Sequence, residues 1–254
     1  MRKSLLLALP ALLLAAPGTS SAQFTLPGCT RPATVTAPFA FVAVNGQCTD
    51  LSALITHVAG AAVWNLNTQL TLAGSLIDVH AVFKPDPFIT FGGTTVNPTD
   101  AAVTYAFLFG TPVVPDFYSS AISTLGLTVT SAMGTTTVGN SATYPAFLSG
   151  YGTTGAALTN LDVDLGTTPC VASGSPATTT CNEGSASSSF APTFYDNLEA
   201  LITYTQDNAA SSVAFTGAVT LNRETVVTPE PATLVLVGIG LVAIGVTTRR
   251  SKLT

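Results

Sequence analysis

The chain has 254 residues, of which 8% are charged, and its formal net charge is −5 at pH 7. Between residues 23 and 228, three basic residues, Arg31, Lys84 and Arg223, are outnumbered by twelve acidic ones. Such an acidic segment repels phosphate backbones, so its composition excludes nucleic acid as a partner. Its length suits a single all-β domain with a core of ordinary size.

The first 22 residues have the order of a secretory signal peptide. Met1-Arg2-Lys3 is a basic start, Ser4 to Ala16 form an apolar run broken only by Pro10, and Ser20-Ser21-Ala22 are small. A signal peptidase cleaves after such small residues, so we expect the mature protein to begin after Ala22. The alternative, a buried N-terminal helix, would not explain why the charge, the apolar run and the small residues occur in this order.

Four cysteines form two local pairs, Cys29 with Cys48 and Cys170 with Cys181. Export makes disulfides the natural interpretation, because extracytoplasmic spaces permit oxidation. Three connectivities are possible, and the shortest loops favour 29–48 and 170–181, each stabilising the fold by about 3 kcal/mol. A zinc site is the alternative, but the spacings are not those of zinc sites. No cofactor is predicted.

Hydrophobic residues between 64 and 221 alternate mostly with a period of two, which predicts half-buried strands. One segment differs: Leu51, Leu54, Ile55 and Val58 have helical spacing, with Thr49 or Asp50 as the N-cap, which predicts a short helix. The predicted strands are Trp64–Leu72, Ile77–Phe83, Val103–Phe109, Leu161–Leu165, Ala200–Tyr204, Val213–Phe215 and Val219–Leu221.

Turn-forming residues separate these runs, and the fold they predict is an antiparallel β-sandwich, Ig-like or jelly-roll-like, over residues 23–228. The sequence from Gly166 to Ser189 is rich in Ser, Thr and Gly, so we expect a long loop closed by Cys170–Cys181. We expect strands of five to ten residues. The predicted turns are Lys84–Pro87, Gly92-Gly93, Asn97-Pro98, Gly110–Pro112 and Gly150–Gly152.

Few residues of the chain could act in catalysis or bind a ligand. Asp78 and His80 share a strand face, but a surface pair explains this spacing without catalysis. Asp162 and Asp164 also share a predicted strand face and could bind calcium with a loop partner, or be merely solvated. Trp64 could stack on a sugar ring, but its place in an alternating strand favours core packing. The chain lacks nucleophile-elbow, zincin and P-loop motifs, so we predict no catalytic residues.

Threonine is frequent throughout the chain. The simpler explanation is its β-propensity at solvent-facing strand positions. The alternative is a function for these hydroxyls, as sites of O-glycosylation or of contact with polysaccharide. The sequence favours the simpler explanation and leaves the other open.

The C-terminal segment combines an apolar run with a basic end. Residues 232–248 carry no charge, and a helix of that length spans about 25 Å, slightly less than a hydrocarbon core of about 30 Å. Arg249, Arg250 and Lys252 follow, which predicts a stop-transfer helix with its basic end, residues 249–254, in the cytoplasm. A buried core helix would not explain this basic end.

Pro229-Glu230-Pro231 stands immediately before the apolar run. With the glycine-containing helix and the arginines after it, this tripeptide resembles the PEP-CTERM sorting signal of Gram-negative bacteria. That resemblance covers residues 229–254. It implies that the tail is recognised and processed by exosortase, a membrane protease, and that the protein is associated with exopolysaccharide, biofilm or floc.

We therefore expect a non-enzymatic envelope or matrix protein, exported across the inner membrane of a Gram-negative bacterium. In this interpretation the precursor is tethered to that membrane and then reaches the cell surface or the medium. The domain would have a structural or adhesive role, with exopolysaccharide as a candidate partner. A carbohydrate-binding module is the alternative, and a secreted hydrolase is the third interpretation.

Overall fold

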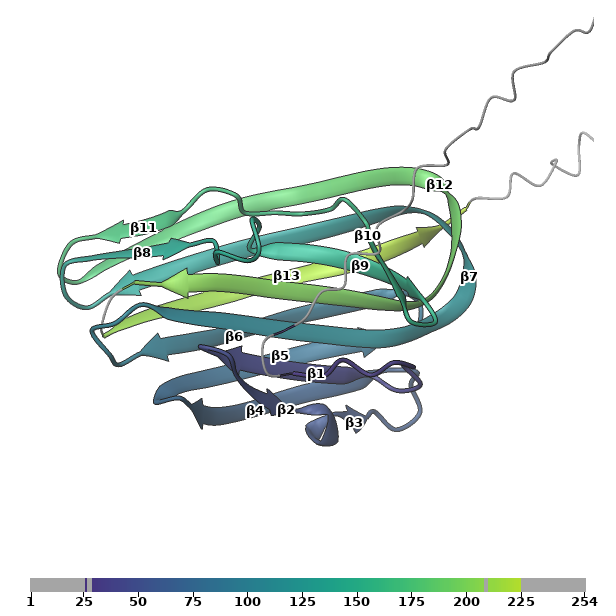
Figure 1. The fold of residues 1–254 in the computed structure, drawn as a ribbon, viewed down its shortest axis with the longest axis horizontal. Helices are drawn as coiled ribbons and strands as arrows, with labels where there is room; N and C mark the ends of the chain where they lie inside the picture. The colour runs from purple at the N-terminus through teal and green to yellow at the C-terminus, as the bar shows by residue number, and fades with distance from the viewer. Residues whose placement is uncertain (1–25, 27–28, 208–209, 225–254) are drawn as a thin grey trace, which may run out of the picture.

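Two long strands that pass from one β-layer into the other organise the fold (Figure 1). The computed structural model describes residues 26, 29–207 and 210–224. Strands β7 (Val103–Ser131) and β12 (Ala177–Gln206) pair antiparallel along most of their length. Their register shifts between Ser189 and Thr193 and again between Tyr195 and Asn197, where the ribbon bends. The predicted strand length of five to ten residues was therefore wrong for these two strands.

Each half of this ribbon belongs to a different layer. In layer I, the first half of β7 and the second half of β12 pair with β1 and β9. The other strands of layer I are at its margins: β1 (Phe39–Val44), β2 (Gln47–Asp50), β9 (Leu148–Thr154) and β10 (Ala157–Asn160), with β8 (Thr135–Gly139) and β11 (Cys170–Ser173) joined to the end of β12.

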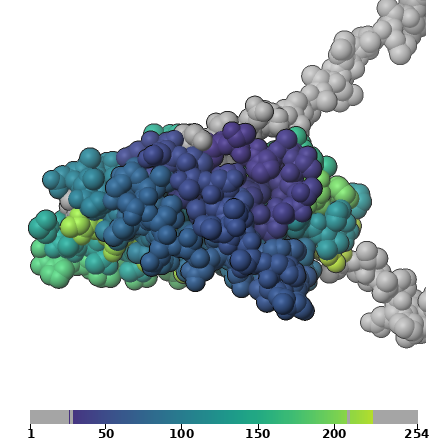
Figure 2. Space-filling model, turned by 90° about the horizontal axis from the view of Figure 1, so that it is seen from below, coloured from purple at the N-terminus to yellow at the C-terminus, as the bar shows by residue number. Residues whose placement is uncertain are grey.

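Layer II contains the second half of β7 and the first half of β12, and β13 pairs with this part of β7. Its further strands follow in the order β13, β6, β5, β4 and β3. Figure 2 shows the molecule from below, where the purple and blue segments of the first half of the chain form most of the surface. The bounds are β3 (Thr56–His57), β4 (Trp64–Leu72), β5 (Ser75–Lys84), β6 (Phe88–Asn97) and β13 (Ser211–Arg223).

The main core lies between the layers and is rich in aromatic rings. Phe107 and Phe109 of layer I are fully buried and pack on rings of layer II. The centroids of Phe107 and Phe215 are 4.8 Å apart, and those of Phe91 and Phe109 are 5.5 Å apart with parallel planes. The predicted alternation is confirmed, because successive side chains of a strand point to opposite faces. The β-sandwich is the fold expected from the sequence.

A second apolar cluster covers the outer face of layer I. It contains Leu108, Leu201 and Phe41, and the N-terminal segment around residues 29–38 lies on it. The cluster is packed against Cys29 and Cys48, which join this segment to β2. The central strands of layer I are thus buried on both faces, which explains why residues 105–109 are apolar at every position.

Two tight hairpins arise from residues with positive φ. Asn45-Gly46 joins β1 to β2 with φ of 49° and 80°, and Ala73-Gly74 joins β4 to β5 with φ of 48° and 82°. These values suit a two-residue hairpin turn whose twist matches the strands. Neither hairpin was predicted from the sequence, whereas the predicted turn at Lys84–Pro87 is confirmed.

Three predicted glycine turns were wrong, because Gly92-Gly93, Gly110–Pro112 and Gly150–Gly152 lie inside strands. Their glycines are required by close neighbours instead of by turns. A Cβ on Gly150 would lie 2.7 Å from Cγ2 of Val163, and one on Gly152 would lie 2.7 Å from the ring of Tyr195. Glycine in a strand interior often marks such a close approach.

Two segment predictions were also wrong. The expected loop over 166–189 contains β11 and the first half of β12, a polar strand whose inward side chains are only half-buried. The expected helix over 51–58 is a single 3-10 turn, η1 (Ser52–Leu54), followed by β3. Asp50 does accept a hydrogen bond from the Ser52 amide, at 2.8 Å, but the chain becomes extended at Ile55.

Candidate functional site

The outer face of layer II presents uncharged polar side chains over most of its width. On β6, β13, β7 and β12, threonine is the most frequent residue at the outward positions of the alternation, followed by serine. We call this surface the hydroxyl face. It consists of Thr90, Thr94, Thr124, Thr128, Thr130, Thr178, Thr180, Ser212, Thr216 and Thr220, all partly or fully exposed.

Register places these hydroxyls opposite one another. Thr128 Oγ1 lies 3.3 Å from Thr180 Oγ1, and Thr130 Oγ1 lies 3.2 Å from Thr178 Oγ1. Such cross-strand pairs stabilise a sheet, and threonine has high β-propensity on exposed positions. The same hydroxyls can donate and accept hydrogen bonds, so the face can bind polar, uncharged molecules.

A shallow hollow of 600 Å³ lies within the hydroxyl face. Thr90, Thr124, Thr216, Asn182 and Ser185 are among the residues that line it. Gly126, which also lines it, has no side chain, and a Cβ there would make only an ordinary contact, 3.7 Å from Cγ2 of Thr216. The hollow is therefore accessible and carries both donors and acceptors of hydrogen bonds.

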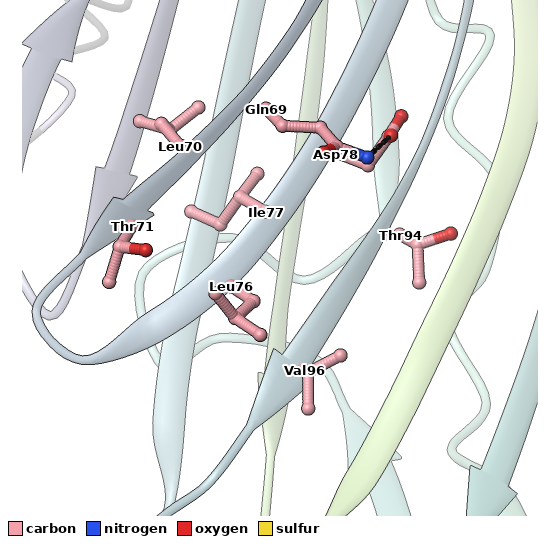
Figure 3. A pocket seen from close by; sticks show the side chains of 8 residues that line it. All are labelled: Gln69, Leu70, Thr71, Leu76, Ile77, Asp78, Thr94 and Val96. Atoms are coloured by element: carbon pink, nitrogen blue, oxygen red, sulfur yellow. Dashed lines mark hydrogen bonds between the residues drawn. The ribbon is translucent and has the colours of Figure 1, made fainter.

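A second hollow, of 530 Å³, lies where β4, β5 and β6 meet (Figure 3). Asp78 and Thr94 lie beside its apolar part, which is formed by Leu70, Leu76, Ile77 and Val96. Gln69 donates a hydrogen bond from Nε2 to Oδ2 of Asp78, at 2.7 Å. This bond holds the carboxylate at the margin of the hollow.

Asp78 and His80 share the outer face of β5, as expected, but each has its own neighbour. Asp78 accepts the hydrogen bond of Gln69, and the ring of His80 lies over Gly92, where a Cβ would be 2.5 Å from Nε2. The carboxylate is thus engaged by an amide. Nothing in this arrangement orients the imidazole toward a nucleophile.

Asp162 and Asp164 do not lie on a strand, so that prediction was wrong. Asp162 has a positive φ of 54°, and its amide donates to Oδ1 of Asn160 at 2.8 Å. Asn160 also donates from Nδ2 to Oδ2 of Asp164, at 3.2 Å. Within residues 26, 29–207 and 210–224, no group of three His, Cys, Asp or Glu side chains is arranged to hold a metal ion.

The two disulfides are paired as expected. Cys29–Cys48 has a Cα–Cα distance of 5.4 Å, and Cys170–Cys181 one of 6.0 Å. The second joins β11 to the first half of β12, instead of closing a loop. Trp64 is half-buried, packs partly on the main core and contacts His57 edge-on, which agrees with the predicted packing role.

An ion pair that was not predicted from the sequence lies beneath the N-terminal segment. Glu199 is fully buried, and Arg31 donates from Nε to its Oε1 at 2.6 Å. Burial raises the pKa of Glu199, and the Arg31 guanidinium opposes this shift. A glutamate between Leu198 and Leu201 was the available signal, because a charge in an apolar run requires a partner.

The predicted tail lies outside the described residues. This applies to Pro229, Glu230 and Pro231, to the apolar run 232–248, and to Arg249, Arg250 and Lys252. The signal peptide, residues 1–22, lies outside them too. In the part of the chain that is described, no helix is long and apolar enough to cross a membrane.

Comparison with known families identifies the tail. The family described as the PEP-CTERM protein-sorting motif matches residues 227–250, so the chain carries this motif and the resemblance noted from the sequence is confirmed. The motif implies export, a membrane-anchored precursor and processing by exosortase. No curated protein matches the chain.

Among solved structures, the chain resembles TmCBM61, which was determined in complex with β-1,4-galactotriose. The two share 8% identity over 63% of this chain and 88% of the other, with a TM-score of 0.24. A similarity of this size assigns no ligand to the hydroxyl face.

Proposed function

We propose that this chain, which carries the PEP-CTERM sorting motif at residues 227–250, is an exported envelope or extracellular-matrix protein of a Gram-negative bacterium. Its signal peptide is removed after Ala22, and the apolar run 232–248 holds the precursor in the inner membrane. Exosortase then processes the tail, and the sandwich reaches the cell surface or the medium. The motif and the basic residues after the apolar run support this route.

The sandwich itself has a non-catalytic role, structural or adhesive, in contact with exopolysaccharide. The observation that carries this proposal is the hydroxyl face, which is broad, uncharged and built on hydrogen-bonded strands. Sugars present hydroxyls that pair with threonine, serine and asparagine side chains. The rigid sheet holds these side chains in place, so little conformational entropy is lost on contact.

Co-sedimentation of the secreted protein with exopolysaccharide from its own host tests this role. Filling the hollow of the hydroxyl face with Gly126→Gln is expected to weaken the binding. Gly139→Gln is the matched control, because Gly139 also has open space around its Cβ position but lies on β8 of layer I. Equal binding by both variants, or no binding by the unmodified protein, would contradict the contact with polysaccharide.

A second measurement, equilibrium binding of short oligosaccharides, separates the two leading interpretations. Saturable binding of a short defined oligosaccharide would identify a carbohydrate-binding module. Binding only to the polymer, in proportion to its mass, supports a structural or adhesive role.

A further inference from the structure

We propose that the bent end of the sandwich rests on the lipid surface of the membrane that holds the tail. This end is defined by Val114, Phe117 and Phe194, and we call it the apolar tip. The inference rests on the proposed anchoring of the precursor through residues 232–248. It adds an orientation for the domain and a second contact with lipid.

Three apolar side chains at the tip are exposed, and two of them form a pair of rings. Phe117 is 54% exposed, Val114 46% and Phe194 38%. Phe117 of β7 is paired in register with Phe194 of β12, and their ring centroids are 5.8 Å apart. Two aromatic rings at the surface lose contact with water if they enter an apolar or interfacial environment, which is favourable.

The chain leaves the described structure at the tip. The amide of Glu224, the last described residue, donates to the carbonyl of Phe117 at 3.3 Å. In Figure 1, β13 ends at the same end of the sandwich as the bends of β7 and β12. The C-terminal tail therefore starts beside the aromatic pair itself.

Sequence length limits the separation between the tip and the membrane. Residues 225–231 lie between Glu224 and the apolar run, and seven residues extend over about 25 Å at most. Because the tail tethers the tip this close to the bilayer, the effective concentration of the lipid surface at the tip is high. Even a weak contact between them is therefore populated. The opposite end of layer II is about 40 Å farther along the strands, at 3.3 Å per residue from Tyr118 to Thr130.

The charged residues of the tip determine which lipid headgroups it can approach. Asp86 and Asp116 form ion pairs with Arg223, at 3.6 Å and 3.3 Å, and Glu224 follows. Lys84, at the end of β5, is a second cation at this end. These three carboxylates outnumber the two cations, so the tip has a net negative charge, which disfavours anionic lipids. We infer that the favourable partner is a zwitterionic surface, which the aromatic rings can enter at headgroup level.

Tryptophan fluorescence in proteoliposomes tests the inference. The full precursor is placed in phosphatidylcholine vesicles whose acyl chains carry bromine near the headgroup. Trp64 is replaced by Phe, and single tryptophans are introduced as Phe117→Trp or, as the control, Leu76→Trp. Leu76 is 57% exposed and lies at the opposite end of layer II.

Bromolipid is expected to quench the Phe117→Trp chain several times more strongly than the Leu76→Trp chain. Phe194→Ser in the Phe117→Trp chain should reduce that quenching, as should the addition of anionic phosphatidylglycerol at low salt. Positions 76, 117 and 194 are exposed, and Trp64→Phe keeps an aromatic ring at a half-buried position, so the variants are expected to fold.

The possible failures are distinguishable. A precursor that does not float with the vesicles would overturn the proposed anchoring, and the contact at the tip with it. Flotation with equal quenching of the two chains would overturn only the contact. Equal quenching together with concentration-dependent dimerisation would identify a second copy as the occupant of the tip.

Discussion

Arg31 and Glu199 are 168 residues apart in sequence, and two nitrogens of Arg31 contact the same carboxylate oxygen of Glu199. Nε of Arg31 lies 2.6 Å from Oε1, and Nη2 lies 2.5 Å from the same oxygen. Oε2 has no hydrogen-bond partner, although Glu199 is fully buried. Arg31 is only 16% exposed, so both charges are largely removed from water. The pair fastens the N-terminal segment to the outer face of layer I.

Removal of Arg31 should destabilise the domain strongly. In Arg31→Met, the carboxylate of Glu199 stays buried without its counter-charge, which costs about 3–5 kcal/mol. Urea unfolding of the secreted protein measures this loss. The double variant Arg31→Met/Glu199→Leu is expected to recover most of it, because it leaves no unpaired charge. A loss below about 1 kcal/mol in Arg31→Met would mean that the pair behaves as a solvated surface pair.

The same variant should respond to pH in a defined direction. Burial is the larger influence and raises the pKa of Glu199, while Arg31 lowers it. A carboxyl whose pKa is raised on folding favours the folded state below its unfolded pKa of about 4.3, and this contribution is lost as the pH rises through the folded pKa. Removing Arg31 raises the folded pKa further.

The defect of Arg31→Met should therefore shrink as the pH is lowered from neutrality toward the pKa of an unfolded glutamate. Urea unfolding at several pH values, compared with the unmodified protein, measures this trend. Arg31→Met/Glu199→Gln serves as the control, because it cannot titrate at residue 199. If the defect grew toward low pH, the assigned influence of burial would be incorrect.

Replacing two glycines of layer II by alanine should have different effects on stability. A Cβ on Gly217 would contact the carbonyl oxygen of Thr124 and would lie 2.8 Å from the ring of Phe91, so Gly217→Ala should cost about 1–3 kcal/mol. Gly126 has open space, so Gly126→Ala should be neutral or stabilise by up to about 1 kcal/mol. Thermal unfolding of both variants checks the contrast. Similar effects would contradict the assigned close approach at Gly217.

The two disulfides should protect different parts of the fold. The bridges cross-link cysteines that are 19 and 11 residues apart in sequence, so the loss of either should cost about 3 kcal/mol. Replacing Cys29 and Cys48 by alanine is expected to increase hydrogen exchange in β1 and the segment before it. Replacing Cys170 and Cys181 should increase it in β8 and β11 instead. Uniformly faster exchange in both variants would show that neither bridge acts locally.

Processing of the tail should depend on Pro229 and Pro231. Proline fixes its own φ and disfavours helix in the residue before it, and a protease requires a backbone whose amides are not bonded within a helix. In an exosortase-positive host, the released protein should lack residues 249–254 by intact mass. Pro229→Ala/Pro231→Ala, or deletion of exosortase, should leave the signal-cleaved precursor in the membrane. A released protein that still contains Arg249 would make the tail a permanent anchor.

The inward faces of the strands could be predicted from sequence, because burial of one face imposes a period of two. Ile77, Val79, Ala81 and Phe83 are all buried for this reason. The first half of β12 could not be recognised, because it lies at the edge of layer II and its inward side chains are only half-buried. A polar strand without a clear apolar side has the composition of a loop.

The glycines that lie inside strands could not be distinguished from turn glycines, for a different reason. At Gly150 and Gly152 the limiting neighbours are Val163 and Tyr195, which local sequence does not bring near. The sorting motif could be recognised because its residues are contiguous. The hydroxyl face could not, because it exists only once the register aligns β7 with β12 and β13.

The position of β13 has a mechanical consequence. It is the last strand before the tail, and it is hydrogen-bonded along residues 211–220 to β6 on one side and along residues 211–223 to β7 on the other. The bonds of an antiparallel ladder are perpendicular to the strands, so a force directed along β13 loads all of them at once. Both ladders must then shear together instead of opening one bond at a time, so the strand that continues into the tail resists tension along its own axis.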